Sequence, residues 1–127
     1  MIEPNAIVLY VENLELSSKF YQELLGIEPD KASPTFNSFT LSNGMGLGLK
    51  AKYAAQPPAD INGGSELAFT LETNKDVDEL FATWQKNKIH IIQPLTDMAY
   101  GYTFLALDPD GNRLRVVSLN KSMAATV

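Results

Sequence analysis

The sequence predicts an α+β domain made of two halves, each with the element order β-α-β-β-β. Short apolar runs rich in β-branched and aromatic residues indicate strands, and two stretches with apolar residues at helical spacing indicate helices. The same order of segments occurs twice, at an offset of roughly sixty residues, which is longer than the periods of solenoid repeats. We expect one domain over residues 1–127, with half-domains at about 4–52 and 64–119 and a linker at 53–63.

The first half begins with a strand and a capped helix. Ala6–Val11 is a short apolar run typical of a buried strand. Asn13 is a favourable N-cap residue, and Gly26 suits a left-handed helix stop. Between them, apolar residues recur at helical spacing, at Leu16, Phe20, Tyr21, Leu24 and Leu25.

Three further strands are expected in the first half. Pro29 limits the segment after the helix to an edge strand or a very short strand, because proline cannot donate to a sheet ladder. Residues 36–41 and 45–50 flank the sequence Ser42-Asn43-Gly44, and Asn-Gly between two apolar runs is a strong hairpin signal.

The second half repeats this order. Glu66–Leu71 is the expected first strand, and Thr73 with Asp76 resembles a capping box. The helix that follows has one apolar face, formed by Val77, Leu80, Phe81 and Trp84, which predicts packing on the sheet. Strands are expected at 89–92, ending at Pro94, and at 102–107 and 114–119, joined by the turn Asp108-Pro109-Asp110-Gly111-Asn112.

Composition and charge argue against several classes of function. The 127 residues are 45% hydrophobic and 20% charged, as in ordinary globular domains. A net charge of −5 argues against nucleic-acid binding, which needs a basic face. No apolar run reaches membrane-spanning length and no signal peptide is evident, so no membrane partner is expected. Zero cysteines fit a reducing compartment, and we expect a cytoplasmic protein.

Metal chemistry has few candidate ligands in this sequence. The chain has a single histidine, His90, and no cysteine, although imidazole and thiolate are common metal ligands. A metal site would therefore consist mostly of carboxylates and water. His90 has no carboxylate or nucleophile at motif spacing, which favours a surface or strand-edge position over a general-base role.

Two segments resemble a known superfamily. FYQELLGIEP at residues 20–29 and LALDPDGNRLRV at residues 105–116 look like the vicinal oxygen chelate superfamily, which includes glyoxalase I, extradiol dioxygenases and bleomycin-resistance proteins. The resemblance extends over about residues 4–119. It implies the glyoxalase/bleomycin-resistance fold, in which the half-domains form curved mixed sheets around a cavity. This fold hosts both metal enzymes and plain binding proteins.

The resemblance also places the superfamily's metal-ligand positions, which fall on Ala6, Gly48, Glu66 and Arg115. Alanine and glycine cannot ligate through a side chain, and the permanent charge of arginine repels a cation. A single carboxylate does not hold a catalytic metal, so we expect no metal and no other cofactor. Glu66 and Arg115 are instead expected to pair inside the cavity, chiefly in a structural role. Separating this pair should then cost more than removing both partners.

Within the superfamily, the sequence looks most like small non-metal drug-binding proteins of the phenazine-antibiotic-resistance type. The shared features are LYVENLELSSKFY at residues 9–21, Ser65-Glu66 at the start of the fifth strand, DVDELFATW at 76–84 and GYTFLALDPDGNRLRV at 101–116. This resemblance implies a homodimer that sequesters a planar drug between aromatic and apolar walls.

Candidate pocket residues come from glycines and aromatic residues of the strands. Gly44, Gly46 and Gly48 alternate with apolar residues and share one strand face, which favours a pocket floor or, equally, a bulged strand covered by a partner subunit. Tyr10 and Tyr102 are preferred among the aromatic residues because a phenol needs a polar partner. The predicted ligand-binding residues are Tyr10, Phe39, Gly46, Gly48, Glu66, Tyr102, Phe104 and Arg115, and no catalytic residue is predicted.

These observations together predict a homodimer that binds or sequesters a small, planar, hydrophobic molecule without metal or catalysis. Two alternatives stay open. One is a metal-dependent lyase or isomerase of the glyoxalase type with an atypical site, and the other is an interaction module whose cavity is vestigial.

Overall fold

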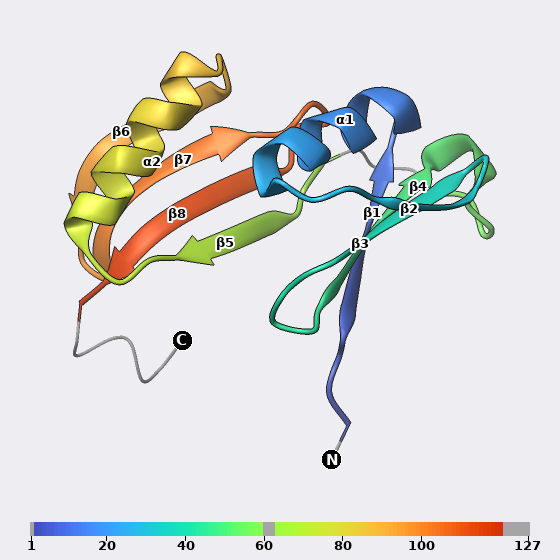
Figure 1. The fold of residues 1–127 in the computed structure, drawn as a ribbon, viewed down its shortest axis with the longest axis horizontal. Coiled ribbons are helices and arrows are strands. Elements are labelled where there is room, and N and C mark those ends of the chain that lie inside the picture. Colours follow the sequence, from blue (N-terminus) through green and yellow to red (C-terminus); the bar gives the residue numbers. More distant parts are fainter. Residues whose placement is uncertain (1, 60–62, 121–127) are drawn as a thin grey trace. The chain divides into compact units, whose positions relative to one another are not determined.

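The computed structural model describes residues 2–59 and 63–120, and the chain forms two compact units, residues 1–63 and residues 64–127. Each unit has the predicted order of one strand, one helix and three strands (Figure 1). Each contains one four-stranded mixed sheet with a helix against one face. In the described ranges, no helix is long and apolar enough to cross a bilayer.

The first unit contains the sheet with strand order β1-β4-β3-β2. The strands β1 (Ala6–Val11) and β4 (Gly46–Ala51) pair in parallel. The strand β3 (Phe36–Thr40) pairs antiparallel with β4 on one side and with β2 (Asp30–Ser33) on the other. A short 3-10 helix, Lys52–Ala54, follows β4. The order confirms the predicted hairpin between β3 and β4 and the short edge strand after Pro29.

The helix α1 (Leu14–Leu25) begins and ends at the predicted residues. The Asn13 side chain accepts a hydrogen bond from the backbone N–H of Leu16 at 3.0 Å, and Gly26 has a left-handed φ of 70°. The face of α1 that is buried is more polar than the sequence pattern suggested. It carries two serines and Tyr21, whereas Leu16 is 55% exposed. Leu16 is next to the buried Ser17 and lies on a different side of the helix, because neighbouring residues are about 100° apart around a helix.

The second unit contains the sheet with strand order β5-β8-β7-β6. The strands β5 (Glu66–Thr70) and β8 (Arg113–Leu119) are parallel, and β7 (Gly101–Leu107) is antiparallel to β8. The helix α2 (Asn74–Lys86) starts at Thr73, whose hydroxyl accepts a hydrogen bond from the backbone N–H of Asp76 at 3.1 Å. Trp84 of α2 packs edge-to-face on two sheet residues, with ring centroids 5.8 Å from Phe69 and 5.4 Å from Phe104.

The strand β6 (His90–Met98) is longer than the sequence predicted, since it continues through Pro94 instead of ending there. It lies at the edge of the sheet, where a missing backbone N–H need not break a ladder. Its register with β7 also shifts between Gln93 and Thr96, next to the proline. His90 lies at the start of this edge strand and is exposed.

The DPDGN segment forms a turn held by a buried carboxylate. One carboxylate oxygen of Asp108 accepts hydrogen bonds from the backbone N–H groups of Asp110 and Asn112, at 2.9 and 2.8 Å. The other accepts one from the Asn112 side-chain amide at 2.9 Å. The Asn112 side-chain oxygen in turn accepts from the backbone N–H of Ser65 at 3.2 Å. The motif therefore ties the β7–β8 turn to the start of β5.

Candidate ligand-binding site

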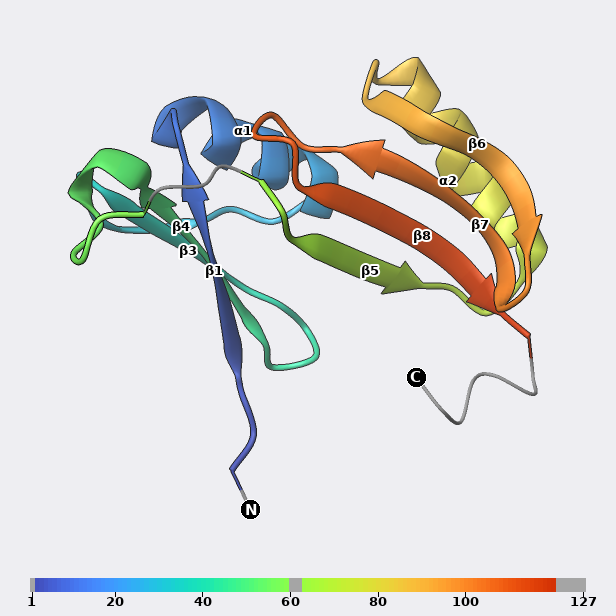
Figure 2. The same ribbon diagram turned by 180° about the vertical axis from the view of Figure 1, so that it is seen from behind.

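The two faces of the second sheet differ. One face is covered by α2, and no helix or strand among residues 64–120 of the same unit covers the other (Figure 2). We call the uncovered side the Arg115 face, because Arg115 of β8 projects from it. Cross-strand register places Ala68 of β5 and Leu105 of β7 beside Arg115 on this face. Glu66 lies two residues before Ala68 and therefore shares the face.

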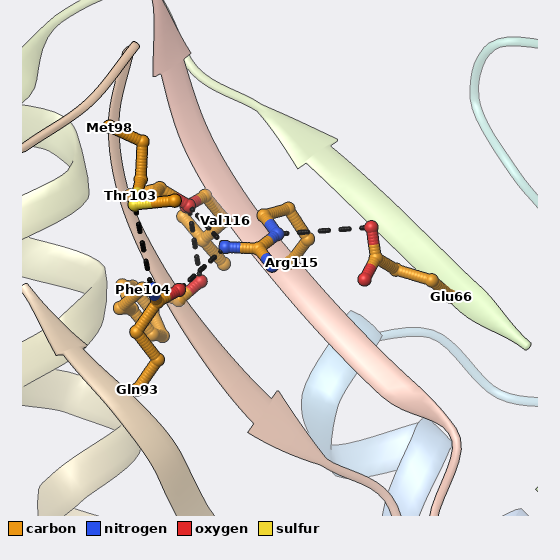
Figure 3. A network of polar contacts seen from close by, with 7 residues as sticks. All are labelled: Glu66, Gln93, Met98, Thr103, Phe104, Arg115 and Val116. Carbon is orange, nitrogen blue, oxygen red and sulfur yellow. Dashed lines mark hydrogen bonds and ion pairs between the residues drawn. The ribbon is translucent and has the colours of Figure 1, made fainter. Parts of the chain in front are cut away.

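Arg115 is held by neutral acceptors on β7, the neighbouring strand, and on β6, the strand beyond it (Figure 3). Its Nη1 donates to Oε1 of Gln93 at 2.7 Å and to Oγ1 of Thr103 at 3.3 Å. The Thr103 hydroxyl in turn donates to the backbone carbonyl of Val116 at 2.6 Å. The guanidinium carbon lies 5.9 Å from the centre of the Tyr100 ring, within cation–π range. These contacts fix the guanidinium in one position while 14% of its side chain stays exposed.

The expected ion pair between Glu66 and Arg115 is present, but it is not a buried one. Oε2 of Glu66 lies 3.8 Å from Nε of Arg115, and 43% of the Glu66 side chain is exposed. An ion pair of this kind contributes at most about 1 kcal/mol to stability. The expectation that separating the pair carries the cost of a buried charge therefore does not hold in this geometry.

Tyr102 and Phe104 lie on the opposite side of the second sheet from Arg115. The Phe104 ring is fully buried, with its centroid 5.1 Å from that of Phe81 on α2. The Tyr102 hydroxyl donates to Oδ1 of Asp78 on α2 at 2.6 Å. Successive residues of a strand point to opposite faces, so Thr103 shares the face of Arg115 and its two neighbours do not. Both aromatic residues belong to the packing of α2 on the sheet.

The predicted residues of the first unit also divide between two faces. Asn37 of β3 donates its side-chain amide to Ser18 of α1 at 3.0 Å, so this face of β3 lies against the helix. Phe39 shares that face and is fully buried. Tyr10, in contrast, is 42% exposed and shares the face opposite α1 with Gly46 and Gly48, as the register of β1 and β4 requires.

The glycines of β4 do not leave an open floor. A Cβ atom at Gly48 would lie 2.7 Å from the ring carbon Cζ of Phe36, so the Phe36 ring lies directly over this glycine. Glycine is required here for the close approach of an aromatic ring. Gly44 lies in the hairpin turn with a φ of 91°, so only Gly46 and Gly48 share the strand face.

A hollow of about 430 Å³ lies beside α1 in the first unit. Most of the residues that line it are polar, among them Lys19, Lys31 and Glu15, and the hydrogen-bonded pair Ser18 and Asn37 also lines it. None of the predicted binding residues contributes to it.

Sequence reasoning missed Gln93 and Thr103, the two residues that hold Arg115. A signal for Thr103 was present, because it is the one polar residue within the apolar run of residues 102–107. Gln93 precedes Pro94 in a segment that was expected to end, so its place beside Arg115 depends on the extension of β6.

The residues at the superfamily's metal positions do not fit a metal. Ala6 and Gly48 offer no donor atom, Arg115 is cationic, and Glu66 is a single half-exposed carboxylate paired with that arginine. Over residues 2–59 and 63–120, no group of three or more His, Cys, Asp or Glu side chains could hold a metal ion. We therefore derive no catalytic step through a metal.

Because of the hydrogen bond between Tyr102 and Asp78, we expect the stability of the protein to depend on pH in the alkaline range. This bond, helped by desolvation and by the nearby charges of Asp78 and Asp97, raises the pKa of Tyr102 from 10.0 to about 12. The folded protein therefore holds the phenol proton more tightly than the unfolded chain does. The resulting stability is fully present below about pH 10 and is lost as the pH rises from about 10 to about 12.

Urea unfolding across this range should show a steeper fall in the free energy of unfolding for the wild type than for Tyr102→Phe. Tyr53→Phe is the control, since 79% of Tyr53 is exposed, and it should keep the wild-type slope. Equal slopes for the wild type and Tyr102→Phe would contradict the stabilising role of this hydrogen bond.

The comparisons with known proteins agree with this architecture. The profile of the Glyoxalase/Bleomycin resistance protein/Dioxygenase superfamily matches residues 4–116. The phenazine antibiotic resistance protein EhpR of Enterobacter agglomerans is 39% identical over 123 residues, which cover 94% of each chain.

Two solved structures show the same fold. Protein ATC0852 of Agrobacterium tumefaciens is 45% identical, with a TM-score of 0.86 over 94% of this chain and 99% of that one. A glyoxalase/bleomycin resistance protein/dioxygenase from Nocardioides reaches a TM-score of 0.82 at 18% identity, over 95% of this chain and 85% of that one. The chain belongs to the Glyoxalase/Bleomycin resistance protein/Dioxygenase superfamily.

Proposed function

We propose that this protein binds and sequesters a small, planar, hydrophobic molecule, in the manner of an antibiotic-resistance protein and without altering the molecule chemically. The observation that carries the proposal is the 39% identity with a phenazine antibiotic resistance protein over 94% of both chains. Phenazines are flat aromatic molecules, so the ligand class is one that a sheet face with aromatic and planar groups can bind.

The Arg115 face is the proposed binding surface. The planar guanidinium of Arg115 and the ring of Tyr100 supply flat groups, and guanidinium planes stack on aromatic rings. Small and apolar side chains stand beside Arg115 in register, namely Ala68 on β5 and Leu105 on β7. This combination of flat, apolar and charged groups suits a planar ligand with at least one polar substituent.

Sequestration requires binding free energy only and no reacting group. The side chains at the superfamily's metal positions cannot supply metal chemistry, because three of the four have no ligand atom that binds a cation. Arg115 also keeps its proton in proteins, which makes it unsuited to general acid–base catalysis. The donor set therefore supports binding in preference to turnover.

Equilibrium dialysis of unsubstituted phenazine, read by its own absorbance, tests the proposal. We expect saturable binding, and mass spectrometry should recover the compound unchanged after prolonged incubation. Ala68→Arg should weaken binding at least about tenfold, because it places a long cation beside Arg115. Ala82→Arg makes the same substitution at an exposed position of α2 and should leave binding within about twofold of the wild type. Chemical conversion of the phenazine, or equal effects of both variants, would contradict the proposal.

We further propose that the chain forms a homodimer. The strand β1 lies at the edge of its sheet and exposes three large apolar or aromatic side chains, with 41% of Ile7, 46% of Val8 and 42% of Tyr10 accessible. An exposed apolar edge strand invites pairing with another chain unless it is covered.

Sedimentation velocity at micromolar concentration should give about twice the 14.0 kDa mass of the chain. Val8→Lys should shift the protein toward monomer, because lysine on an edge opposes strand pairing. Leu16→Lys is the matched control on α1, where 55% of Leu16 is exposed, and should leave the dimer intact. A monomer at all concentrations would contradict dimerisation.

A further inference from the structure

The guanidinium of Arg115 has one edge that forms no hydrogen bond to the part of the chain that the structure describes. Arginine has five N–H donors. Both hydrogen bonds of Arg115 to the described residues use Nη1, and they go to Gln93 and Thr103. Its Nε lies 3.8 Å from the nearest Glu66 oxygen, which is too long for a hydrogen bond, and Nη2 has no partner among the described residues. The edge formed by Nε and Nη2 is therefore fixed in place with its donors uncommitted.

The side-chain amide of Gln93, beside Arg115, also has a donor with only a weak acceptor. Its side-chain oxygen accepts from Arg115, which fixes the orientation of the amide group and directs Nε2 to the other side. The acceptor that Nε2 meets there is the thioether sulfur of Met98, at 3.7 Å. A thioether is a weak acceptor, so this contact is readily replaced by a better one. Met98 is itself 39% exposed.

Glu66 balances the charge of Arg115 without occupying its free edge. The carboxylate lies close enough for an ion pair and too far for a bidentate contact, and it is half exposed. It can therefore move into solvent at little cost when another anion arrives. Two parallel N–H donors on a planar group match the two oxygens of a carboxylate.

We propose that the planar ligand carries a carboxylate, which binds the Nε and Nη2 edge of Arg115 and displaces Glu66. This inference rests on the proposed binding function and names the chemical class of its ligand. The aromatic part of the ligand lies along the Arg115 face. The carboxylate of the ligand distinguishes it from neutral planar molecules, which cannot form this contact with Arg115. Arg115 is thus the specificity-determining residue of the site.

A matched pair of probes tests the inference, namely phenazine-1-carboxylate and unsubstituted phenazine at neutral pH. Equilibrium dialysis should show that the wild type binds the carboxylate at least about tenfold more tightly than phenazine. Arg115→Met should weaken binding of the carboxylate at least about tenfold more than it weakens binding of phenazine, which removes the preference. Glu66→Gln should strengthen binding of the carboxylate alone, because it removes a competing anion.

Arg113→Met is the matched control. Arg113 is an exposed arginine of β8, two residues before Arg115 and on the same face, so its removal changes the net charge equally. The preference for the carboxylate should stay within about twofold of the wild type. Arg115→Lys is a second variant that keeps the charge and lacks the paired donors, and it should lose most of the preference.

The outcomes separate the two proposals. If the wild type binds neither probe, the binding function itself is overturned, and this inference with it. If the wild type binds both probes equally, or if Arg115→Met weakens both alike, binding stands and the role of Arg115 in ligand selection is overturned. If Arg113→Met removes the preference as fully as Arg115→Met does, general charge attraction replaces the specific contact.

Discussion

Replacing Asp108 with asparagine should lower the free energy of unfolding by about 2–3 kcal/mol, because hydrogen bonds to a buried charged group are costly to lose. Asp108 is 6% exposed, and its carboxylate accepts three hydrogen bonds within its own turn. An asparagine side chain has the same shape but would turn an N–H group toward one set of these donors. Chemical denaturation at neutral pH measures the loss.

The control for this prediction is Glu72→Gln, which removes one negative charge from an exposed residue. It should change stability by less than about 0.5 kcal/mol. A second comparison is Asn112→Ala, which removes both the bond to Asp108 and the bond to the backbone of Ser65. An Asp108→Asn protein as stable as the Glu72→Gln protein would mean that the turn is held by its backbone alone.

The Asp108 turn also explains why its sequence motif indicates the fold and not an activity. Its polar side chains are used within the turn and at the start of β5, and the turn joins the two central strands of its sheet. A motif with this role is compatible with any chemistry on the sheet surface. The same argument accounts for the success of the helix boundaries, since Asn13, Gly26 and Thr73 act through contacts within four residues.

The face to which each strand residue points was less predictable. Apart from Thr103, the run of residues 102–107 is apolar on both faces of β7, so its pattern does not reveal which side meets α2. The position of α2 decides it, and α2 covers the side of Tyr102 and Phe104. Phe39 follows the same rule in the first unit, where the hydrogen bond from Asn37 to α1 marks the covered face.

The partners of Arg115 were unpredictable for a related reason. Gln93 on β6 and Thr103 on β7 lie 22 and 12 residues before Arg115 in the sequence. The position of Gln93 also depends on the pairing of β6 with β7, whose register shifts near Pro94. The resemblance to a known superfamily identified the charged pair of Glu66 and Arg115, because both stand at that superfamily's metal-ligand positions. The resemblance did not indicate the two neutral acceptors, Gln93 and Thr103, to which Arg115 donates its hydrogen bonds.

Arg115→Met should lower the free energy of unfolding by about 2 kcal/mol, whereas Glu66→Gln should cost less than about 1 kcal/mol. Removing Arg115 leaves Gln93 without its donor and takes a charge-assisted bond from the fully buried Thr103. Removing Glu66 costs little, because its carboxylate lies 3.8 Å from Nε and is half exposed. The two single variants and the double variant, compared by urea unfolding, form a cycle that measures the coupling between them.

We expect a coupling energy below about 0.5 kcal/mol between Glu66 and Arg115, so the double variant should resemble Arg115→Met. A second cycle with Gln93→Leu and Arg115→Met is the matched comparison, and it should show a coupling of about 1–2 kcal/mol, because these side chains share a 2.7 Å hydrogen bond. A double Glu66→Gln, Arg115→Met protein more stable than either single variant would identify a buried ion pair instead. In that case Glu66 would hold Arg115, and its carboxylate would not be free to leave when an anionic ligand binds.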